Sequence, residues 1–273
     1  IDGRATSCMV PMGSLACRFV FGKAVQITKI RGRLHEVKGR CVFPMLSPHA
    51  VLRNPEHRLV FESDFQTLAR LAENGFKIEE STDTKFDYSW QFDLRDWLGT
   101  FQPKAVAVDT ETTGVRWNDP DTRVLTVQLC IGPGRAAAFP VDPDYCRRWF
   151  PEMTDQQRAI LVAQLKELLE DPKVLKIGFN FKFDHQILMK PPLSIRTNPW
   201  VHDVQMLAWA VNQDMPRKDL AECTRIWVPE MAGYSDLFDA MVDKSRMIDV
   251  PPVDQVDLEG RRIPGMLHYA CGD

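Results

Sequence analysis

The sequence predicts an α/β protein built of two unequal parts. Three observations predict it. Short apolar, strand-like segments alternate with segments of helical spacing, a polar aperiodic stretch interrupts the pattern at 77–84, and the charge changes sign across that stretch. Residues 1–75 carry 11 Lys and Arg against 6 Asp and Glu, whereas the rest of the chain carries 23 against 31. We therefore expect a first part at 1–76, a linker at 77–84 and a second part at 85–273.

Composition excludes several classes of protein. The chain has 273 residues, of which 44% are hydrophobic and 26% charged, as in ordinary globular proteins. No stretch of the sequence approaches the ~18 consecutive apolar residues of a membrane-spanning helix. Seven cysteines are scattered without a Cys-x-x-Cys pair, which argues against a disulfide framework and a structural zinc site. The first residue is Ile1, without a signal peptide, so we expect an internal piece of a longer protein.

The first part reads as strands alternating with helices, each bounded by residues that start or stop such segments. Glycines follow the first strand and the first helix, and an Asn-Pro pair, with Asn as N-cap and Pro in the first turn, starts the last helix. The expected elements are strands at 8–11 and 41–45, a helix at 14–21, and a helix from Pro55 to the Asn74-Gly75 stop.

The second part has the clearer pattern. Thr154 and Gln157 form a capping box that starts the longest of its helices. The expected strands, all short and apolar, are 105–108, 123–130, 136–141 and 174–179. The expected helices are 154–171, 182–190, 203–211, 220–227 and 264–273. Strands followed by helices around one sheet make this part an α/β domain.

Two acidic residues mark the end of the first buried strand of the second part. Side chains two apart in a strand point to the same side, so Asp109 and Glu111 project together. Two carboxylates held close repel each other unless a cation lies between them, and hard oxygen donors suit Mg²⁺ or Mn²⁺. The pair is therefore a candidate cation site, and a solvated acidic strand end is the alternative.

Two further segments carry acids in similar settings. Asp184 follows Asn180 by four residues at a strand-to-helix junction, where a favourable charge in the first helical turn is the alternative reading. Tyr269 and Asp273 are four apart on a late helix, hence neighbours on one face, and a phenol beside a carboxylate can orient a water molecule. A surface tyrosine on an amphipathic helix is the alternative for this last segment.

In combination these segments resemble a known family. D-x-E on a strand, N-x-x-x-D at a strand–helix junction and Y-x-x-x-D on a late helix resemble the three motifs of the DEDD exonuclease superfamily, Tyr subclass. The stretches VDTETTG, IGFNFKFD and HYACGD, with HDVQMLAWAVN and KDLAECTRIW between the last two, are similar to the proofreading domain of family A DNA polymerases, the DNA polymerase I type. The resemblance covers residues 84–273 and implies a ribonuclease-H-like fold, a mixed sheet flanked by helices.

The resemblance also implies a chemistry. It implies a 3′–5′ proofreading exonuclease that hydrolyses phosphodiester bonds with two divalent cations, Mg²⁺ or Mn²⁺. Asp109 would bridge both ions, Glu111 and Asp273 would complete the site of the first, and Asp184 would hold the second, largely through water. Tyr269 would position the attacking water.

The implied substrate is the 3′ end of single-stranded DNA, whose bases would stack on apolar or aromatic side chains. Asn180 and Phe183 are candidate DNA contacts, and of Phe181 and Phe183 one is expected in the core. The negative charge of the second part does not favour strong DNA binding by itself. A neighbouring basic domain would deliver the strand, and the resemblance implies a polymerase domain C-terminal to this chain. No membrane association is expected.

The first part resembles a piece of another family. VPMG, ITKIRGRLHEVKGR and FPMLSPHAVLRNPEHR are similar to the C-terminal half of family 4 uracil-DNA glycosylases, which implies a partial α/β glycosylase-like module. Ser47 stands where that family has a histidine, and His49 lies two residues further on, so we expect the module to be degenerate and inactive. Its basic residues are candidates for DNA phosphate contacts, with a solvated face as the alternative, and they include Lys29, Arg31, Arg33 and Arg53.

The sequence thus favours an exonuclease that acts on DNA, and two alternatives stay open. An exoribonuclease of the same superfamily is one, although the TETTG form of the first motif favours DNA. A non-catalytic DNA-binding scaffold is the other, and the intact set of four acids argues against it. Reduced cysteines and the absence of a leader favour a cytoplasmic location, in a bacterium or in the host of a phage.

Overall fold

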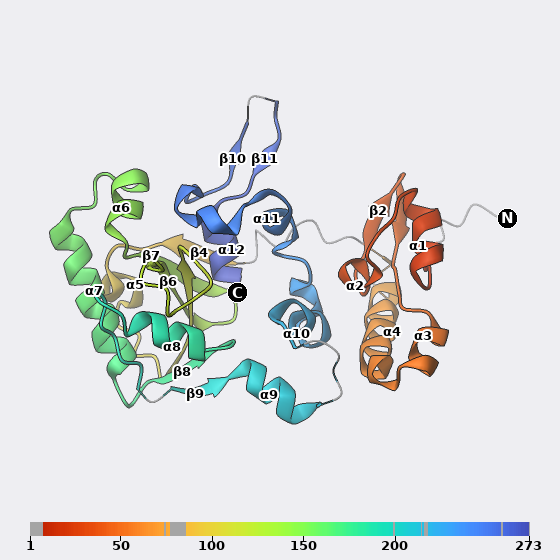
Figure 1. The fold of residues 1–273 in the computed structure, drawn as a ribbon, viewed down its shortest axis with the longest axis horizontal. Helices are drawn as coiled ribbons and strands as arrows, with labels where there is room; N and C mark the ends of the chain where they lie inside the picture. Colours follow the sequence, from red (N-terminus) through yellow and green to blue (C-terminus); the bar gives the residue numbers. More distant parts are fainter. Residues whose placement is uncertain are drawn as a thin grey trace. The chain divides into compact units, whose positions relative to one another are not determined.

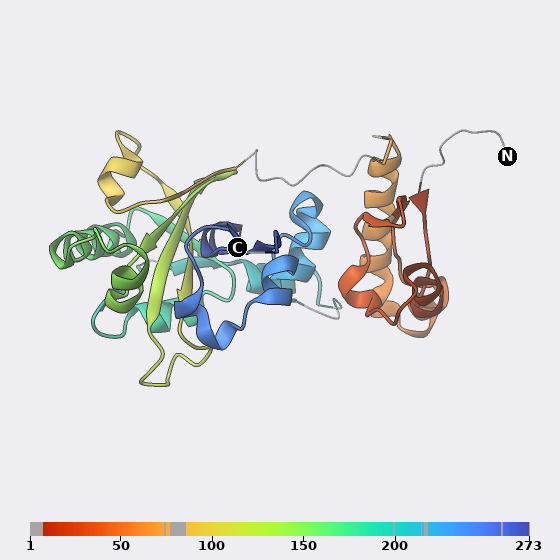
Figure 2. The same cartoon turned by 90° about the horizontal axis from the view of Figure 1, so that it is seen from above.

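The computed structural model describes residues 8–73, 75–76, 86–198, 200–213, 215, 218–257 and 259–272. The expected linker at 77–84 lies outside the described residues. The chain forms two compact units, each described by itself below (Figures 1 and 2). Unit 1 consists of Ile1–Thr82 and Ala208–Gly233, and unit 2 of Asp83–Leu207 and Tyr234–Asp273.

Unit 1 contains a small sheet of three strands in the order β1-β3-β2. β1 runs parallel to β3, and β2 pairs antiparallel with β3. The first elements are β1 (Cys8–Met9), α1 (Ser14–Phe21), α2 (Ile27–Ile30), β2 (His35–Val37) and β3 (Arg40–Val42). They are followed by α3 (Pro48–Arg53), η1 (Pro55–His57) and α4 (Arg58–Glu73), and the later segment adds α10 (Leu220–Trp227) and η3 (Pro229–Met231).

Unit 2 is built on a six-stranded mixed sheet of order β4-β7-β6-β5-β8-β9. β5, β6 and β7 are antiparallel neighbours, whereas β4, β8 and β9 join in parallel. The strands are β4 (Asp87–Trp90), β5 (Ala105–Thr112), β6 (Val124–Gly132), β7 (Arg135–Pro140), β8 (Leu175–Gly178) and β9 (Trp200–Asp203). A separate hairpin pairs β10 (Gln255–Val256) with β11 (Arg262–Ile263).

Helices cover both faces of this sheet. One face packs its buried Val106, Val108 and Leu129 against α5 (Leu94–Leu98), α7 (Asp155–Glu170) and α8 (Lys182–Leu188). The opposite face packs against α6 (Pro143–Trp149), α11 (Asp236–Met241), η4 (Lys244–Asp249) and α12 (Met266–Gly272). α9 (Val204–Val211) follows the edge strand β9. The sheet therefore separates two layers, and residues on β5 can face either of them.

Local signals in the sequence predicted several elements well. Helices at 14–21 and 220–227 are confirmed with the expected bounds as α1 and α10. Gly22 ends α1 in the left-handed conformation with φ 69°, as expected for a glycine stop. The capping box of Thr154 and Gln157 is present at the start of α7. The sequence did not predict β4, β9, α5, α6, α11 or the β10–β11 hairpin, all of which are short.

Candidate functional site

The first acidic pair lies on β5, at the centre of the sheet of unit 2. Thr110 is the register partner of Val127, which belongs to the core under α7 and α8. Since side chains alternate along a strand, Asp109 and Glu111 point to the opposite face, the one that α12 covers. Glu111 is only 8% exposed. The two carboxylates therefore project together, as predicted, toward the layer that contains α12.

α12 packs against β5 and the neighbouring strands, on the side of the acidic pair. Burial raises the pKa of the Tyr269 phenol, and the charges of Glu111, Asp239 and Asp109 raise it further. The pKa of the Cys271 thiol is raised by burial first and also by Cys130, Asp109 and Glu111. Negative charge thus accumulates between β5 and α12.

Tyr269 is held on two sides. Its ring stacks on Phe238 of α11 with centroids 3.8 Å apart and planes 6° from parallel. The Nζ atom of Lys244 donates a 2.8 Å hydrogen bond to the phenol oxygen. The same ammonium pairs with Asp239 at 2.7 Å. The orientation of Tyr269 is therefore defined by α11 and η4 as well as by its own helix.

Asp184 approaches β5 from the other layer. It lies in the first turn of α8, is 4% exposed, and accepts a 2.7 Å hydrogen bond at Oδ1 from the hydroxyl of Thr110. Burial raises the pKa of the Asp184 carboxyl to about 7, and the Thr110 hydrogen bond opposes that rise. Thr110 therefore links the strand of the first motif to the helix of the second.

The turn that leads into α8 is held by another acid. Asn180 is exposed and adopts the left-handed conformation with φ 55°, which asparagine tolerates better than most residues. Its backbone N–H donates to Asp203 Oδ1 at 3.1 Å, and the same oxygen accepts from Gln205 N at 2.9 Å. Asp203 thus connects the start of α8 to the start of α9. Of the two neighbouring phenylalanines, Phe181 is fully buried in the core, whereas Phe183 is partly exposed and packs against it.

The structure describes three of the four expected metal ligands, namely Asp109, Glu111 and Asp184. Asp273 lies outside the described residues. Within the described ranges, no group of three or more His, Cys, Asp and Glu side chains is arranged to hold a metal ion. Asp109 and Glu111 share one layer of unit 2, and Asp184 is bound to the strand from the opposite layer.

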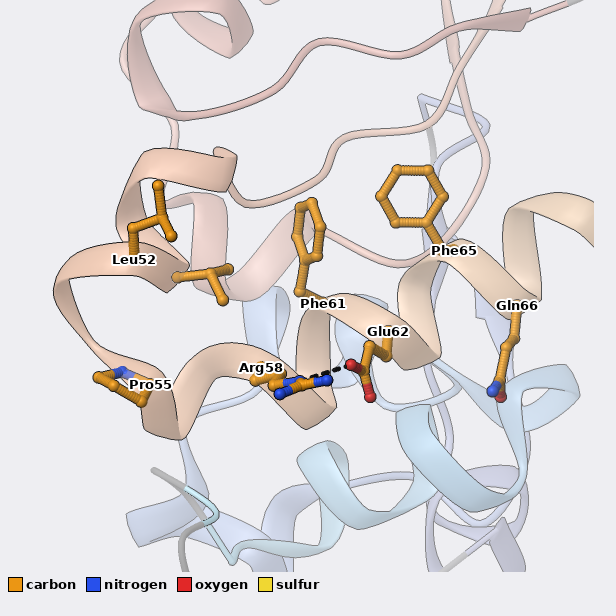
Figure 3. Close-up of a pocket in the computed structure, with 8 residues that line it drawn as sticks. Leu52, Pro55, Arg58, Phe61, Glu62, Phe65 and Gln66 are labelled. Atoms are coloured by element: carbon orange, nitrogen blue, oxygen red, sulfur yellow. Dashed lines mark hydrogen bonds and ion pairs between the residues drawn. The ribbon is translucent and has the colours of Figure 1, made fainter.

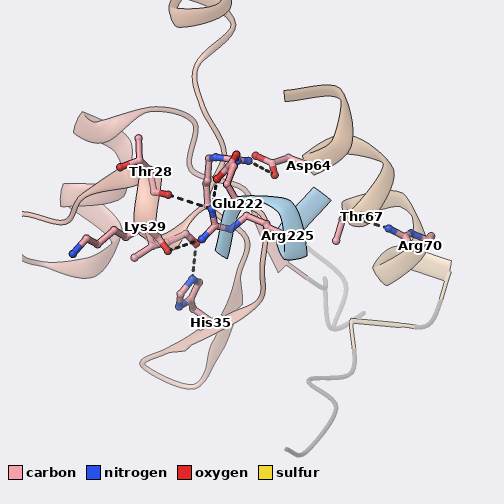
Figure 4. A network of polar contacts seen from close by, with 10 residues as sticks. Thr28, Lys29, His35, Asp64, Thr67, Arg70, Glu222 and Arg225 are labelled. Atoms are coloured by element: carbon pink, nitrogen blue, oxygen red, sulfur yellow. Dashed lines mark hydrogen bonds and ion pairs between the residues drawn. The ribbon is translucent and has the colours of Figure 1, made fainter. Parts of the chain in front are cut away.

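In unit 1 the prediction that Arg31 contacts DNA phosphate is wrong. Arg31 is 2% exposed and its guanidinium is paired with Asp64, at 2.6 Å, and with Glu222. Arg225 joins the network through Glu222 at 2.6 Å (Figure 4). A cation buried between two carboxylates is not available to a polyanion. The sequence could not show this, because Glu222 is 191 residues away.

The other predicted residues of unit 1 lie at or near the surface. Lys29 and Arg53 are exposed and Arg33 is partly exposed. Ser47 is the N-cap of α3, where its hydroxyl accepts from Ala50 N at 3.2 Å. His49 is exposed, and its Nδ1 atom lies 3.2 Å from the Arg53 guanidinium.

Unit 1 also has an apolar groove of about 700 Å³ between α3 and α4. Leu52, Phe61 and Phe65 line it, and an exposed Arg58–Glu62 ion pair at 2.7 Å borders it (Figure 3). No residue of the expected catalytic set contributes to this groove.

Comparison with known proteins assigns the chain to a family. Residues 89–237, more than half of the chain, match the model of the 3′–5′ exonuclease domain of DNA polymerase A type. The chain belongs to this 3′–5′ exonuclease family. Its mixed sheet with helices on both faces is the expected ribonuclease-H-like fold. Among the described residues, no helix combines the length and apolar character needed to cross a bilayer.

Individual relatives of this exonuclease are DNA polymerases. The chain is 42% identical over 256 residues to a DNA polymerase of Bacillus phage SP01, covering 85% of this chain and 26% of the relative. It is 28% identical over 175 residues to DNA polymerase I of Pseudomonas aeruginosa, covering 63% and 18%. The chain therefore spans about a quarter or less of the length of these relatives.

Solved structures of nucleases are also similar. Brucella melitensis NrnC is 21% identical with a TM-score of 0.40, over 69% of this chain and 74% of that one. Trypanosoma brucei RNase D in complex with RNA U12 is 17% identical with a TM-score of 0.42, over 63% and 57%.

Several residues that shape the site of this exonuclease were missed from the sequence. Thr110 had a usable signal, because it is a polar residue at an inward position that continues Val106 and Val108. Asp203 had one too, as an acid at the start of an expected helix. Phe238 and Lys244 had none, since their contacts with Tyr269 depend on how three short helices pack.

Proposed function

We propose that this chain is the metal-dependent 3′–5′ proofreading exonuclease domain of a family A DNA polymerase, acting on the 3′ ends of single-stranded DNA. The observation that carries the proposal is the position of Asp109 and Glu111, side by side on β5 and facing the helix that bears Tyr269. The match to polymerase exonuclease domains over residues 89–237 supports it.

The donor set fits divalent cations. Asp109 and Glu111 offer hard oxygen ligands on one face of β5, the kind that Mg²⁺ and Mn²⁺ prefer. Asp273 would complete the set, together with Asp184, which would act from the opposite layer and largely through water. Two Mg²⁺ or Mn²⁺ ions, when bound, would supply charge stabilisation at the scissile phosphate and a reactive water at neutral pH.

The protein's own side chains would orient the reactants. Tyr269, stacked on Phe238, would direct its hydroxyl to the attacking water in line with the phosphate. Thr110 would hold the Asp184 carboxylate in a fixed rotamer. Asn180 and the partly exposed Phe183 would contact the DNA strand as it enters.

For residues 1–76 we propose a degenerate module related to family 4 uracil-DNA glycosylases that binds DNA without excising bases. The Gly13 turn supports this proposal. Gly13 N donates to Met45 O at 2.8 Å, which brings together the VPMG and FPMLSPHAVLRNPEHR segments that resemble the glycosylase family. Ser47 acts as a helix cap, and the exposed His49 contacts Arg53. Lys29, Arg33 and Arg53 remain the proposed phosphate contacts. The polymerase domain would follow C-terminally, and the protein would act in a bacterial or phage-infected cytoplasm.

A degradation assay tests the function. The chain is incubated with 5′-labelled single-stranded DNA, or RNA of the same sequence, with Mg²⁺, Mn²⁺ or EDTA. We expect a ladder shortened from the 3′ end on DNA with either metal and none in EDTA, and Asp109→Ala should abolish it. Preference for RNA would favour the exoribonuclease alternative. DNA binding without degradation under every condition would favour a non-catalytic scaffold.

A further inference from the structure

Lys244 contacts the phenol of Tyr269 but has no role in the proposed function described above. It begins η4, and its Nζ atom lies 2.8 Å from the Tyr269 phenol oxygen and 2.7 Å from Asp239 Oδ1. Asp239 is itself bound by Ser235, whose hydroxyl donates to Oδ2 at 3.1 Å. A chain of polar contacts therefore runs from α11 through Lys244 to Tyr269, entirely within unit 2.

The chemistry of the two groups decides which of them donates the hydrogen bond and which accepts it. An ammonium group only donates hydrogen bonds, so the phenol oxygen is the acceptor. The phenol hydrogen must then point to a different partner. The ring is already fixed by its stack on Phe238, with planes 6° from parallel. Because the ring and one side of its oxygen are both occupied, the phenol hydrogen has a restricted set of directions.

We propose that Lys244 is a positioning residue for Tyr269, which makes the phenol a hydrogen-bond donor toward the layer that contains Asp109 and Glu111. A water molecule there would accept the phenol hydrogen and present its lone pairs elsewhere, as an in-line attack on a phosphate requires. This inference rests on the proposed exonuclease function. Asp239, paired with Lys244 at 2.7 Å, would keep the flexible lysine side chain beside the phenol.

The inference predicts a specific pattern of kinetics. With saturating Mg²⁺ and 5′-labelled single-stranded DNA, Lys244→Met should lower kcat by about tenfold, the effect of one charge-assisted hydrogen bond, with KM changed less than about twofold. Lys244→Arg keeps a donor and should restore most of the rate. In a Tyr269→Phe background, Lys244→Met should have no further effect, because the group it positions is gone.

Structural damage is checked separately, without metal or DNA. Lys173→Met, which removes an exposed lysine from the same unit, is the matched control and should behave as the parent. Both variants should keep the parent's melting temperature. In ¹³Cζ-tyrosine NMR spectra, the resonance assigned to Tyr269 by its loss in Tyr269→Phe should shift in Lys244→Met and stay in place in Lys173→Met.

Three results would overturn the inference. One is a rise in KM at constant kcat for Lys244→Met, which would make Lys244 a direct contact of the DNA backbone. Another is full additivity of Lys244→Met and Tyr269→Phe. The third is an unshifted Tyr269 resonance in Lys244→Met. Failure of the proposed function has a different signature, namely full activity of Asp109→Ala.

Discussion

The hydroxyl of Thr110 donates a 2.7 Å hydrogen bond to Asp184 Oδ1, joining the two sequence motifs across one strand. Both side chains are buried, at 8% and 4% exposure. Thr110 stands between Asp109 and Glu111 in the sequence but points to the opposite face of β5. β5 therefore carries Asp109 and Glu111 on one face, and from its other face it orients Asp184 through the Thr110 hydrogen bond.

Thr110→Val should weaken both stability and catalysis. Valine has the same shape but leaves the buried Asp184 carboxylate without this donor, which should lower the free energy of unfolding by about 1–3 kcal/mol. We expect kcat to fall with it, since the Asp184 rotamer is no longer defined. Thr110→Ser keeps the hydroxyl and should retain most of the activity. Chemical denaturation and single-strand degradation assays measure the two effects, and equal losses in both variants would contradict this role.

Asp109→Asn should uncouple stability from metal. In the parent, Mg²⁺ or Mn²⁺ binds the folded state only, which at 100 times the dissociation constant adds about 2.7 kcal/mol to the free energy of unfolding. The variant should lose most of this gain. In EDTA it should be as stable as the parent or more so, because one of two adjacent like charges is removed. Thermal melts with and without metal test this, and an unchanged metal-dependent shift would remove Asp109 from the ligand set.

Arg31→Met should destabilise unit 1 strongly. The substitution leaves Asp64 and Glu222 buried without the guanidinium they share, and loss of one partner of a buried pair costs about 3–5 kcal/mol. Arg58→Met is the control, since the Arg58–Glu62 pair is solvent-exposed and should contribute little to the free energy of unfolding. Denaturant titration of both variants compares them. Similar losses of unfolding free energy in the two variants would show that the buried network contributes no more to stability than the exposed pair does.

Asp64 should make the stability of unit 1 depend on pH. Burial raises its pKa to about 6, from an ordinary value of 3.8, although Arg31 lowers it and Glu222 opposes Arg31. The folded state therefore holds a proton on Asp64 more tightly than the unfolded state does. Its contribution to the free energy of unfolding is then fully present below about pH 4 and is lost as the pH rises to about 6.

Asp64→Asn should remove this dependence. The difference in unfolding free energy between parent and variant should change by at most about 3 kcal/mol across this window, in favour of the parent at the acidic end. Taking the difference cancels the other carboxyl groups. Denaturant titrations at several pH values measure it. A difference that stays flat, or that favours the parent at the upper end, would contradict the assigned direction.

Sequence reasoning succeeded where neighbours in the chain decide the structure. α1 and α10 were predicted with their observed bounds, because glycine stops, N-caps and helical spacing act within a few residues. The side-by-side placement of Asp109 and Glu111 followed from strand alternation alone. Sequence reasoning failed for Arg31, because the acids that pair with this buried cation are 33 and 191 residues away. A basic run looks the same whether its members are solvated or paired in a core.

The sequence by itself determined the α/β class, the main strands and helices of both units and the acidic motifs, since these depend on periodicity, local capping and the chemistry of single side chains. Tertiary structure alone decided that Ala208–Gly233 packs with the N-terminal segment and that Thr110 binds Asp184. It alone placed Phe238 and Lys244 around Tyr269. Such contacts arise from the packing of distant elements, where burial and charge pairing select partners that no local pattern encodes.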